Sequence, residues 1–176
     1  MAYLRDLLLV IAIVLTGALF GASLYDQVVM APNYGADIPQ SLEHAKQFMV
    51  AASPANLFRF LAPATQISLL LSLILNGGVK GRRWFLLVAL LLTVAGDVIT
   101  FTFHYPRNAI LFTDPMNTPV GVLTKAAVEW SYGNVARCCL ILIANLLVIF
   151  AAMPAKRTLS ATTPEADRTS AAVSAR

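Results

Sequence analysis

Four long apolar stretches constrain this chain more than any other feature of its sequence. Each is long enough to cross a hydrocarbon core of about 30 Å as an α-helix, which rises about 1.5 Å per residue. Only 12% of the residues are charged, about half of what a water-facing surface carries. The sequence therefore predicts an all-α, polytopic membrane protein, built as an antiparallel bundle of four transmembrane helices. The predicted spans are residues 4–24, 56–75, 84–105 and 125–153.

Two loops are predicted on the side of the membrane opposite the short connector between the second and third spans. The first covers residues 25–54 and contains Pro32 and other residues that break regular structure. Within it, residues 41–52 have apolar side chains at helical spacing, which predicts a short amphipathic helix. The second predicted loop covers residues 106–124.

Basic residues beside the spans predict the orientation, because loops rich in Lys and Arg stay in the cytoplasm. One group lies in the connector and another follows the fourth span: Lys80, Arg82, Arg83, Lys156 and Arg157. We therefore expect a multi-pass protein of the inner or plasma membrane with both termini cytoplasmic. Residues 1–153 form the predicted transmembrane domain, and the Ser/Thr/Ala-rich tail, 154–176, is predicted to be disordered. The net charge of +4 is explained by these positions beside lipid and indicates no nucleic-acid partner.

Polar side chains within the spans gather toward the end of the bundle that carries the two loops. A charge near the bilayer centre costs about 2.5–3.5 kcal/mol on insertion scales, so such residues need partners, water or a function. The third and fourth spans each carry a polar stripe on one helical face, and the first two spans add to them. These residues are Asp97, Thr100 and His104; Trp130, Asn134 and Arg137, with Glu129 beside them; Asn56, Arg59 and Gln66; and Asp26.

Two interpretations of this polar cluster remain open. In the structural one, Arg137 neutralises Asp97 or Glu129, and the amide side chains join helices. In the functional one, the groups surround a cavity that opens to the outer leaflet and binds a polar ligand. His104 is then the candidate for proton transfer, because imidazole titrates near neutral pH. Asp97 lies two turns away on the same face, so contact with His104 needs Thr100 or water between them.

No cofactor is predicted, and a metal site remains a weaker alternative. Potential ligands occur, but none is arranged in a metal-binding spacing such as HxxxH or ExxH. The two cysteines are neighbours rather than a CxxC pair, which argues against thiol redox chemistry. The potential ligands are Asp26, Glu43, His44, His104 and Glu129.

Two short motifs carry a family resemblance. Residues 104–111 read HYPRNAIL, a P-x-N-x-x-L pattern, and residues 130–137 read WSYGNVAR, a W-x-x-x-N-x-x-R pattern. Together with four spans in 176 residues, they resemble the DUF1772, or anthrone oxygenase-like, membrane family. The resemblance implies a four-helix bundle. Some members of that family oxidise anthrones to anthraquinones with dioxygen and no evident cofactor, and many have no assigned activity.

Carried onto this chain, the resemblance implies an oxygenase that acts on a small hydrophobic aromatic or phenolic substrate. In that scheme His104 removes a proton, and Arg137 and Asn134 stabilise the resulting oxyanion. The expected catalytic residues are His104, Arg137, Asn134 and Asp97, and the expected substrate-binding residues are Trp130, Asn108, Tyr105, Phe101, Arg59 and Glu129.

A non-enzymatic alternative explains the same residues. The polar cluster could hold a membrane lipid headgroup or a partner, including a second copy of the chain. Whether the protein is an enzyme therefore stays open at the level of sequence. Transport is the weakest interpretation, because the apolar half opposite the loops leaves no continuous polar path.

Overall fold

The computed structural model describes residues 2–153, which form helices and no strand. Four helical rods dominate, and all four are long and apolar enough to cross a membrane. This confirms the predicted all-α, four-helix membrane fold. The rods are α1 (Ala2–Tyr25) with η1 (Asp26–Met30) and α2 (Ala31–Gly35); α4 (Pro54–Leu75); α5 (Lys80–Ile99) with η2 (Thr100–His104) and α6 (Tyr105–Phe112); and α7 (Val120–Ala152). The predicted tail lies outside the described residues.

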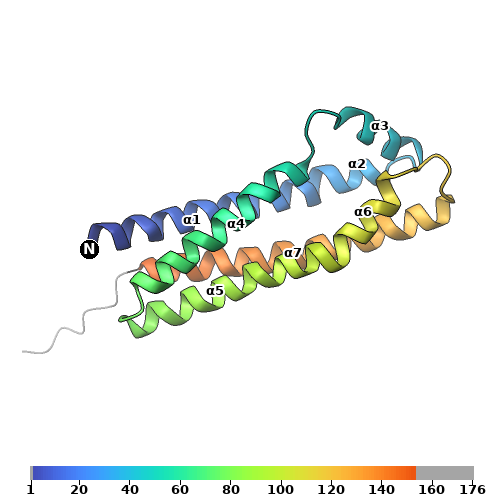
Figure 1. Ribbon diagram of the computed structural model, residues 1–176. Helices are drawn as coiled ribbons and strands as arrows, with labels where there is room; N and C mark the ends of the chain where they lie inside the picture. Colours follow the sequence, from blue (N-terminus) through green and yellow to red (C-terminus); the bar gives the residue numbers. More distant parts are fainter. Residues whose placement is uncertain (1, 154–176) are drawn as a thin grey trace, which may run out of the picture.

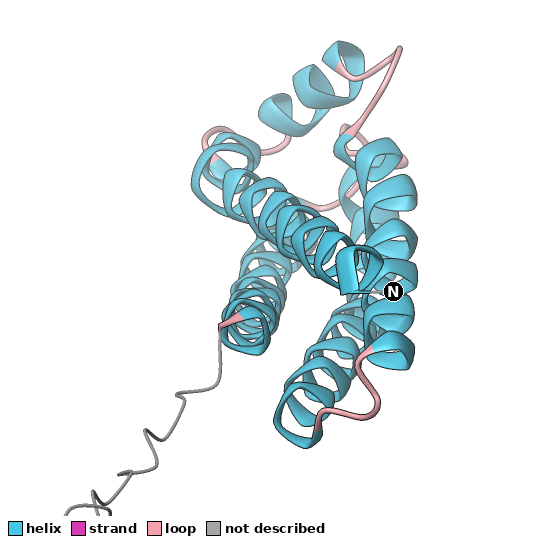
Figure 2. Cartoon of the chain, turned by 90° about the vertical axis from the view of Figure 1, so that its left-hand side faces the viewer, coloured by secondary structure: helices cyan, strands magenta, loops and turns pink. Residues whose placement is uncertain are grey.

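The rods run antiparallel, and each packs on two neighbours (Figures 1 and 2). α1 contacts α4 and α7, and α5 contacts the same two helices. One end of the bundle carries Ala2, the α4–α5 connector and the end of α7, and we call it the terminal end. The opposite end carries α2, α6 and the short helix α3 (Gln40–Phe48), and we call it the α3 end.

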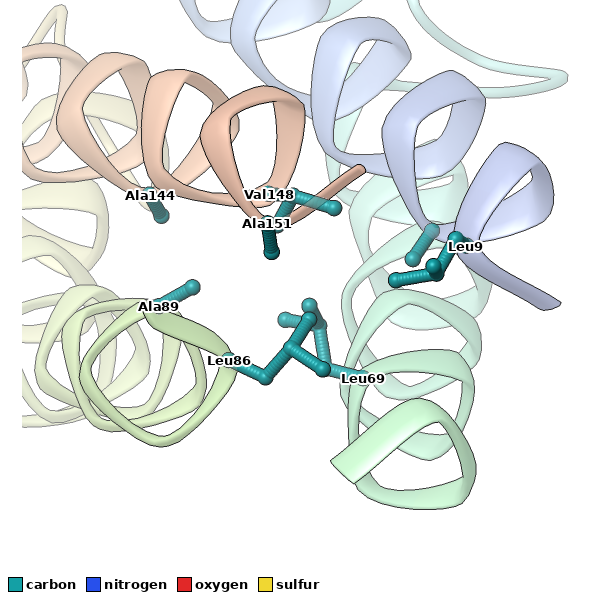
Figure 3. Close-up of a cluster of buried hydrophobic side chains, with 8 residues drawn as sticks. Leu9, Leu69, Leu86, Ala89, Ala144, Val148 and Ala151 are labelled. Atoms are coloured by element: carbon teal, nitrogen blue, oxygen red, sulfur yellow. The ribbon is translucent and has the colours of Figure 1, made fainter. Parts of the chain in front are cut away.

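A dry core holds the terminal half together. Leucines from three rods meet small residues of α5 and α7, which lets the helices approach closely (Figure 3). Van der Waals packing of this kind is the main force between helices in a bilayer, where lipid is as apolar as leucine. The cluster consists of Leu9, Ala12, Leu69, Leu86, Ala89, Ala144, Val148 and Ala151.

The predicted loop at 25–54 is wrong in its first part, because the first rod stays helical to Gly35 and passes through Pro32. The third rod likewise passes through Pro106 and ends at Phe112, beyond the predicted end at residue 105. In each case a π-helical turn precedes the proline, with a backbone bond from residue i+5 to residue i. A wider turn accommodates a proline ring that would clash in a regular α-helix.

The α3 end is closed by a second apolar cluster. α3 confirms the predicted amphipathic helix in a shorter form, and Leu42 is fully buried beneath it. α7 begins at Val120 rather than at residue 125, so the second loop is short. The cluster joins α2, α3, α6 and α7 through Tyr34, Leu42, Leu111, Leu123, Ala126 and Trp130.

Candidate functional site

A cavity of about 680 Å³ lies within the α3 half of the bundle, beneath α3. This volume falls in the range of sites that hold small organic ligands. All four rods and α3 contribute to its wall, which is mostly apolar with a few polar groups. The ionisable and amide side chains that line it are Asp26, Lys46, Arg59, Asp97, His104, Asn108 and Arg137.

Arg137 is the central charge of the cavity. Its Nη2 donates a hydrogen bond to Asn134 Oδ1 at 2.7 Å and lies 3.6 Å from Asp26 Oδ2. Its Nη1 lies 3.4 Å from the Thr100 hydroxyl, and the guanidinium sits 4.6 Å from the centre of the Phe58 ring. The ion-pair partner is therefore Asp26, and not Asp97 or Glu129 as the structural interpretation of the sequence had it. Arg137 Nε has no hydrogen-bond partner in the described chain.

Asn134 positions Arg137 and does not reach the cavity. Its Nδ2 donates to the Ser23 carbonyl at 3.2 Å and to Gln27 Oε1 at 3.1 Å. Gln27 in turn donates to the Ser131 hydroxyl at 2.8 Å. Because the amide of Asn134 is committed on both sides and lies outside the cavity lining, we reassign it from oxyanion binding to holding the guanidinium.

His104 lies on the π turn η2 and is almost fully buried, with 2% of its surface exposed. Its ring packs edge-to-face on Trp130 with centroids 5.1 Å apart. Neither ring nitrogen has a hydrogen-bond partner in the described chain, although both are buried and the residue lines the cavity. Buried polar groups of this kind are rare in proteins and mark places where a ligand or water binds.

Asp97 does not form the relay to His104 that the sequence suggested. It accepts a hydrogen bond of 2.6 Å from Gln66 Nε2, which joins α4 to α5 at the floor of the cavity. Thr100, the expected intermediary, donates instead to the Gly96 carbonyl at 3.0 Å. The π turn begins at Thr100, so His104 leaves the helical face on which the sequence had placed it with Asp97.

Asn108 and Trp130 form a fixed pair on the cavity wall. The Trp130 indole Nε1 donates to Asn108 Oδ1 at 2.7 Å. An indole only donates, so the amide oxygen of Asn108 must face it. The amide nitrogen of Asn108 then keeps its hydrogens for the cavity, since it makes no bond within the described chain.

The remaining predicted substrate-binding residues divide into two groups. Phe101, Tyr105 and Arg59 line the cavity, and the two rings pack edge-to-face 5.2 Å apart. Glu129 does not line it. Glu129 instead pairs with Arg107 at 2.9 Å, and with Lys125 at 3.9 Å.

The potential metal ligands do not converge. No three His, Cys, Asp or Glu side chains gather closely enough to hold a metal ion within residues 2–153. His44 is exposed on α3 and does not line the cavity, whereas His104 is buried within it. The two histidines therefore serve as a natural pair for experiments.

Sequence reasoning underrated the first rod. Ser23, Asp26 and Gln27 are spaced three and four residues apart, which places them on one helical face. In the structure this face binds Arg137 and Asn134. The spacing was visible in the sequence, but the expected end of the helix at residue 24 hid it.

Comparison with known proteins gave no match, either to a protein-family model, to a curated protein or to a solved structure. The resemblance to the anthrone oxygenase-like family therefore stays a prediction. The function of the chain has to be argued from the geometry of the cavity.

Proposed function

We propose that this protein is a membrane-embedded oxygenase that needs no cofactor and acts on a small aromatic carbon acid in the cavity of the α3 half. One observation carries the proposal: both nitrogens of the buried His104 imidazole lack a partner in the described chain, on the wall that also holds Arg137. A neutral imidazole can accept a proton, and a guanidinium can stabilise the anion left behind.

The chemistry needs only groups that this cavity offers. An anthrone loses a proton from its ring CH₂ to His104 and becomes an enolate. The enolate is electron-rich enough to react with dioxygen directly, so the CH₂ group becomes a carbonyl and one water is released. Anthrone and dioxygen thus give anthraquinone and water, with dioxygen as the oxidant. The protein supplies the base, the anion-stabilising donors and a site largely screened from water.

Two donors suit the enolate oxygen. Arg137 Nε is unpartnered in the described chain, and the Asn108 amide nitrogen is aimed by the Trp130 bond on its oxygen. Asp26 and Asn134 act through Arg137, which they orient from two sides. Donors that are held in place before the reaction stabilise developing charge without reorganising.

Dioxygen uptake by the purified protein with an anthrone substrate tests the proposal. We expect uptake that survives a chelator and falls at least about 100-fold in His104→Ala, the usual scale for losing a general base. Arg137→Gln should fall on the order of 100-fold as well. His44→Ala is the matched control, because it removes a histidine that lies outside the cavity lining, and it should retain full uptake.

Three results would contradict the proposal. Full uptake in folded His104→Ala removes the base, and loss of uptake with chelator points to a metal. No uptake above the uncatalysed rate leaves a non-enzymatic amphipath-binding protein as the function. The observation that favours this second candidate is the exposure of Phe101 and Tyr105, which line the cavity yet face outward by 61% and 41%.

We further propose that the terminal end faces the cytoplasm. The α4–α5 connector and the start of α5 hold Lys80, Arg82 and Arg83, and the positive-inside rule assigns such segments to that side. Single cysteines at Arg83 and Lys125, in a background with Cys138 and Cys139 replaced by serine, test this in intact cells. An impermeant thiol reagent should label only the cysteine at position 125, and the reverse pattern overturns the orientation.

A further inference from the structure

The cavity has an opening on the side of the bundle, between α4 and the η2–α6 segment. Five of its lining side chains are exposed, and they stand on the facing edges of these elements and on α3. α4 packs on α1 and α5, and it is not packed extensively on η2 or α6 in the described chain. The exposed lining residues are Lys46, Arg59, Pro63, Phe101 and Tyr105. We call this opening the lateral slit.

The lateral slit is graded along its length. Pro63 and Phe101 form its deeper part, nearer the middle of the rods, and are apolar. Arg59 lies one helical turn from Pro63 toward the α3 end, and Lys46 on α3 adds a second cation there. A molecule entering from the bilayer thus meets an apolar deeper edge and a basic edge at the α3 end.

Arg59 is the cation of this edge that is free to bind a ligand. Lys46 is already engaged, with its Nζ donating to the Thr113 carbonyl at 2.9 Å. Arg59 forms no ion pair with any residue of the described chain. A guanidinium offers several donors in a planar fork that matches the two oxygens of a carboxylate.

We propose that the ligand enters through the lateral slit from the bilayer and is a ring-bearing amphipath with an acidic group, which Arg59 binds while the ring reaches His104. The inference rests on the proposed function for the deep end of the cavity and adds to it the substrate's acidic group. Arg59 is then a specificity-determining residue. Arg137 cannot replace it, because Arg137 already pairs with Asp26.

The test uses binding of a probe that cannot react, so that it is independent of turnover. The probe is 9-anthracenecarboxylate, a three-ring acid, and its neutral counterpart is 9-anthracenemethanol. Trp130 lies on the cavity wall and reports binding by energy transfer to the anthracene ring. Trp84, which is exposed on α5, is first replaced in a Trp84→Phe background. Zwitterionic bilayer discs keep lipid charge out of the comparison, and affinities are expressed per probe dissolved in the bilayer.

We expect the acid to bind more tightly than the alcohol. Arg59→Gln should weaken the acid about threefold, the scale of a partly exposed ion pair, and leave the alcohol unchanged. Arg59→Lys should keep part of the preference for the acid. Lys125→Gln is the matched control, because it removes a cation of the α3 half that does not line the cavity, and it should bind both probes like the parent.

Equal binding of acid and alcohol, or an Arg59→Gln variant that binds the acid like the parent, overturns the inference. Dioxygen uptake with a neutral anthrone would then still support the proposed function. Conversely, a clear Arg59-dependent preference for the acid without any dioxygen uptake supports the acidic ligand and contradicts the oxygenase. Absence of energy transfer from Trp130 with either probe also overturns the inference, since the cavity then takes up neither ring.

Discussion

The two halves of the bundle are built from the same four rods but with opposite chemistry. In the terminal half, alanines of α5 and α7 let leucines of three rods close the space between the helices. In the α3 half, a cavity separates the rods and buried polar groups line it. Small apolar residues are favourable between helices in lipid, whereas buried charges are costly and need paired partners. The comparison teaches that the dry half stabilises a scaffold on which the other half can keep groups of low intrinsic stability.

Breaking the buried ion pair should have the largest effect on stability. Asp26→Asn leaves the Arg137 charge without its partner, which we expect to lower the free energy of unfolding by about 3–5 kcal/mol. The double variant Asp26→Asn/Arg137→Gln should recover most of that loss and still fail to consume dioxygen. Reversible unfolding in bicelles measures the first effect, and oxygen uptake measures the second.

Asp6→Asn is the control for this pair, because Asp6 is exposed at the terminal end and pairs loosely with Arg5 and Arg82. It should change the unfolding free energy by less than about 1 kcal/mol. A double variant as unstable as Asp26→Asn alone would show that charge pairing does not explain the cost.

Removing a core side chain from the dry half should lower stability without touching the site. Leu69 is fully buried in the terminal cluster, so Leu69→Ala should cost about 2 kcal/mol. This is the lower end of the usual range, since lipid solvates the released surface in the unfolded state. Binding of the anthracene probes should be unchanged. The neighbouring exposed Leu70 is the matched control, and an equal loss in Leu70→Ala would contradict the packing account.

Gly133 tests how tightly α7 holds the His104 turn. A methyl group there would lie 2.5 Å from a ring carbon of Phe103 and 3.4 Å from Cε1 of His104. We expect Gly133→Ala to cost about 1–2 kcal/mol and to reduce dioxygen uptake by moving the imidazole. Gly21→Ala adds its methyl where nothing lies within 4 Å and should change neither quantity. Full uptake in Gly133→Ala would mean that the position of His104 tolerates displacement.

The smallest effect is expected for the one polar pair that joins α1 to α7 outside the cavity lining. Asn145 Nδ2 donates to the Thr16 hydroxyl at 2.7 Å, and hydrogen bonds between membrane helices are worth about 0.6 kcal/mol on average. Asn145→Leu should therefore cost about that amount in unfolding free energy. Asn134→Leu should cost clearly more, because it also removes a hydrogen bond to the Arg137 guanidinium. Equal costs would erase the energetic difference between the two halves.

The sequence was sufficient for the fold because hydropathy alone identifies helices that must satisfy their own backbone in lipid. It was also sufficient to place His104, Arg137 and Asn108 in one half. It was insufficient for pairings, since Arg137 had several acidic candidates at similar helical depth. The choice of Asp26 depends on a first rod that stays helical past the residues expected to end it.

Prolines were the main source of error in the predicted boundaries. Pro32 and Pro106 are sound signals for the end of an α-helix, and the rods continue through them only because a π turn comes first. No simple residue pattern marks a π turn. For the same reason, the helical stripe of Asp97, Thr100 and His104 failed as a guide to contacts, although each residue reached the cavity.

The two π turns also set a condition on chain length. Each holds one residue more than a regular helical turn, so everything beyond it is rotated by about 100° and advanced by about 1.5 Å relative to an unbroken helix. Deleting a single residue between Thr100 and His104 would restore an ordinary helix that could still cross the bilayer. The deletion would nevertheless turn Asn108 away from Trp130. This stretch of sequence therefore tolerates substitution far better than loss, and its exact count of residues is part of the site.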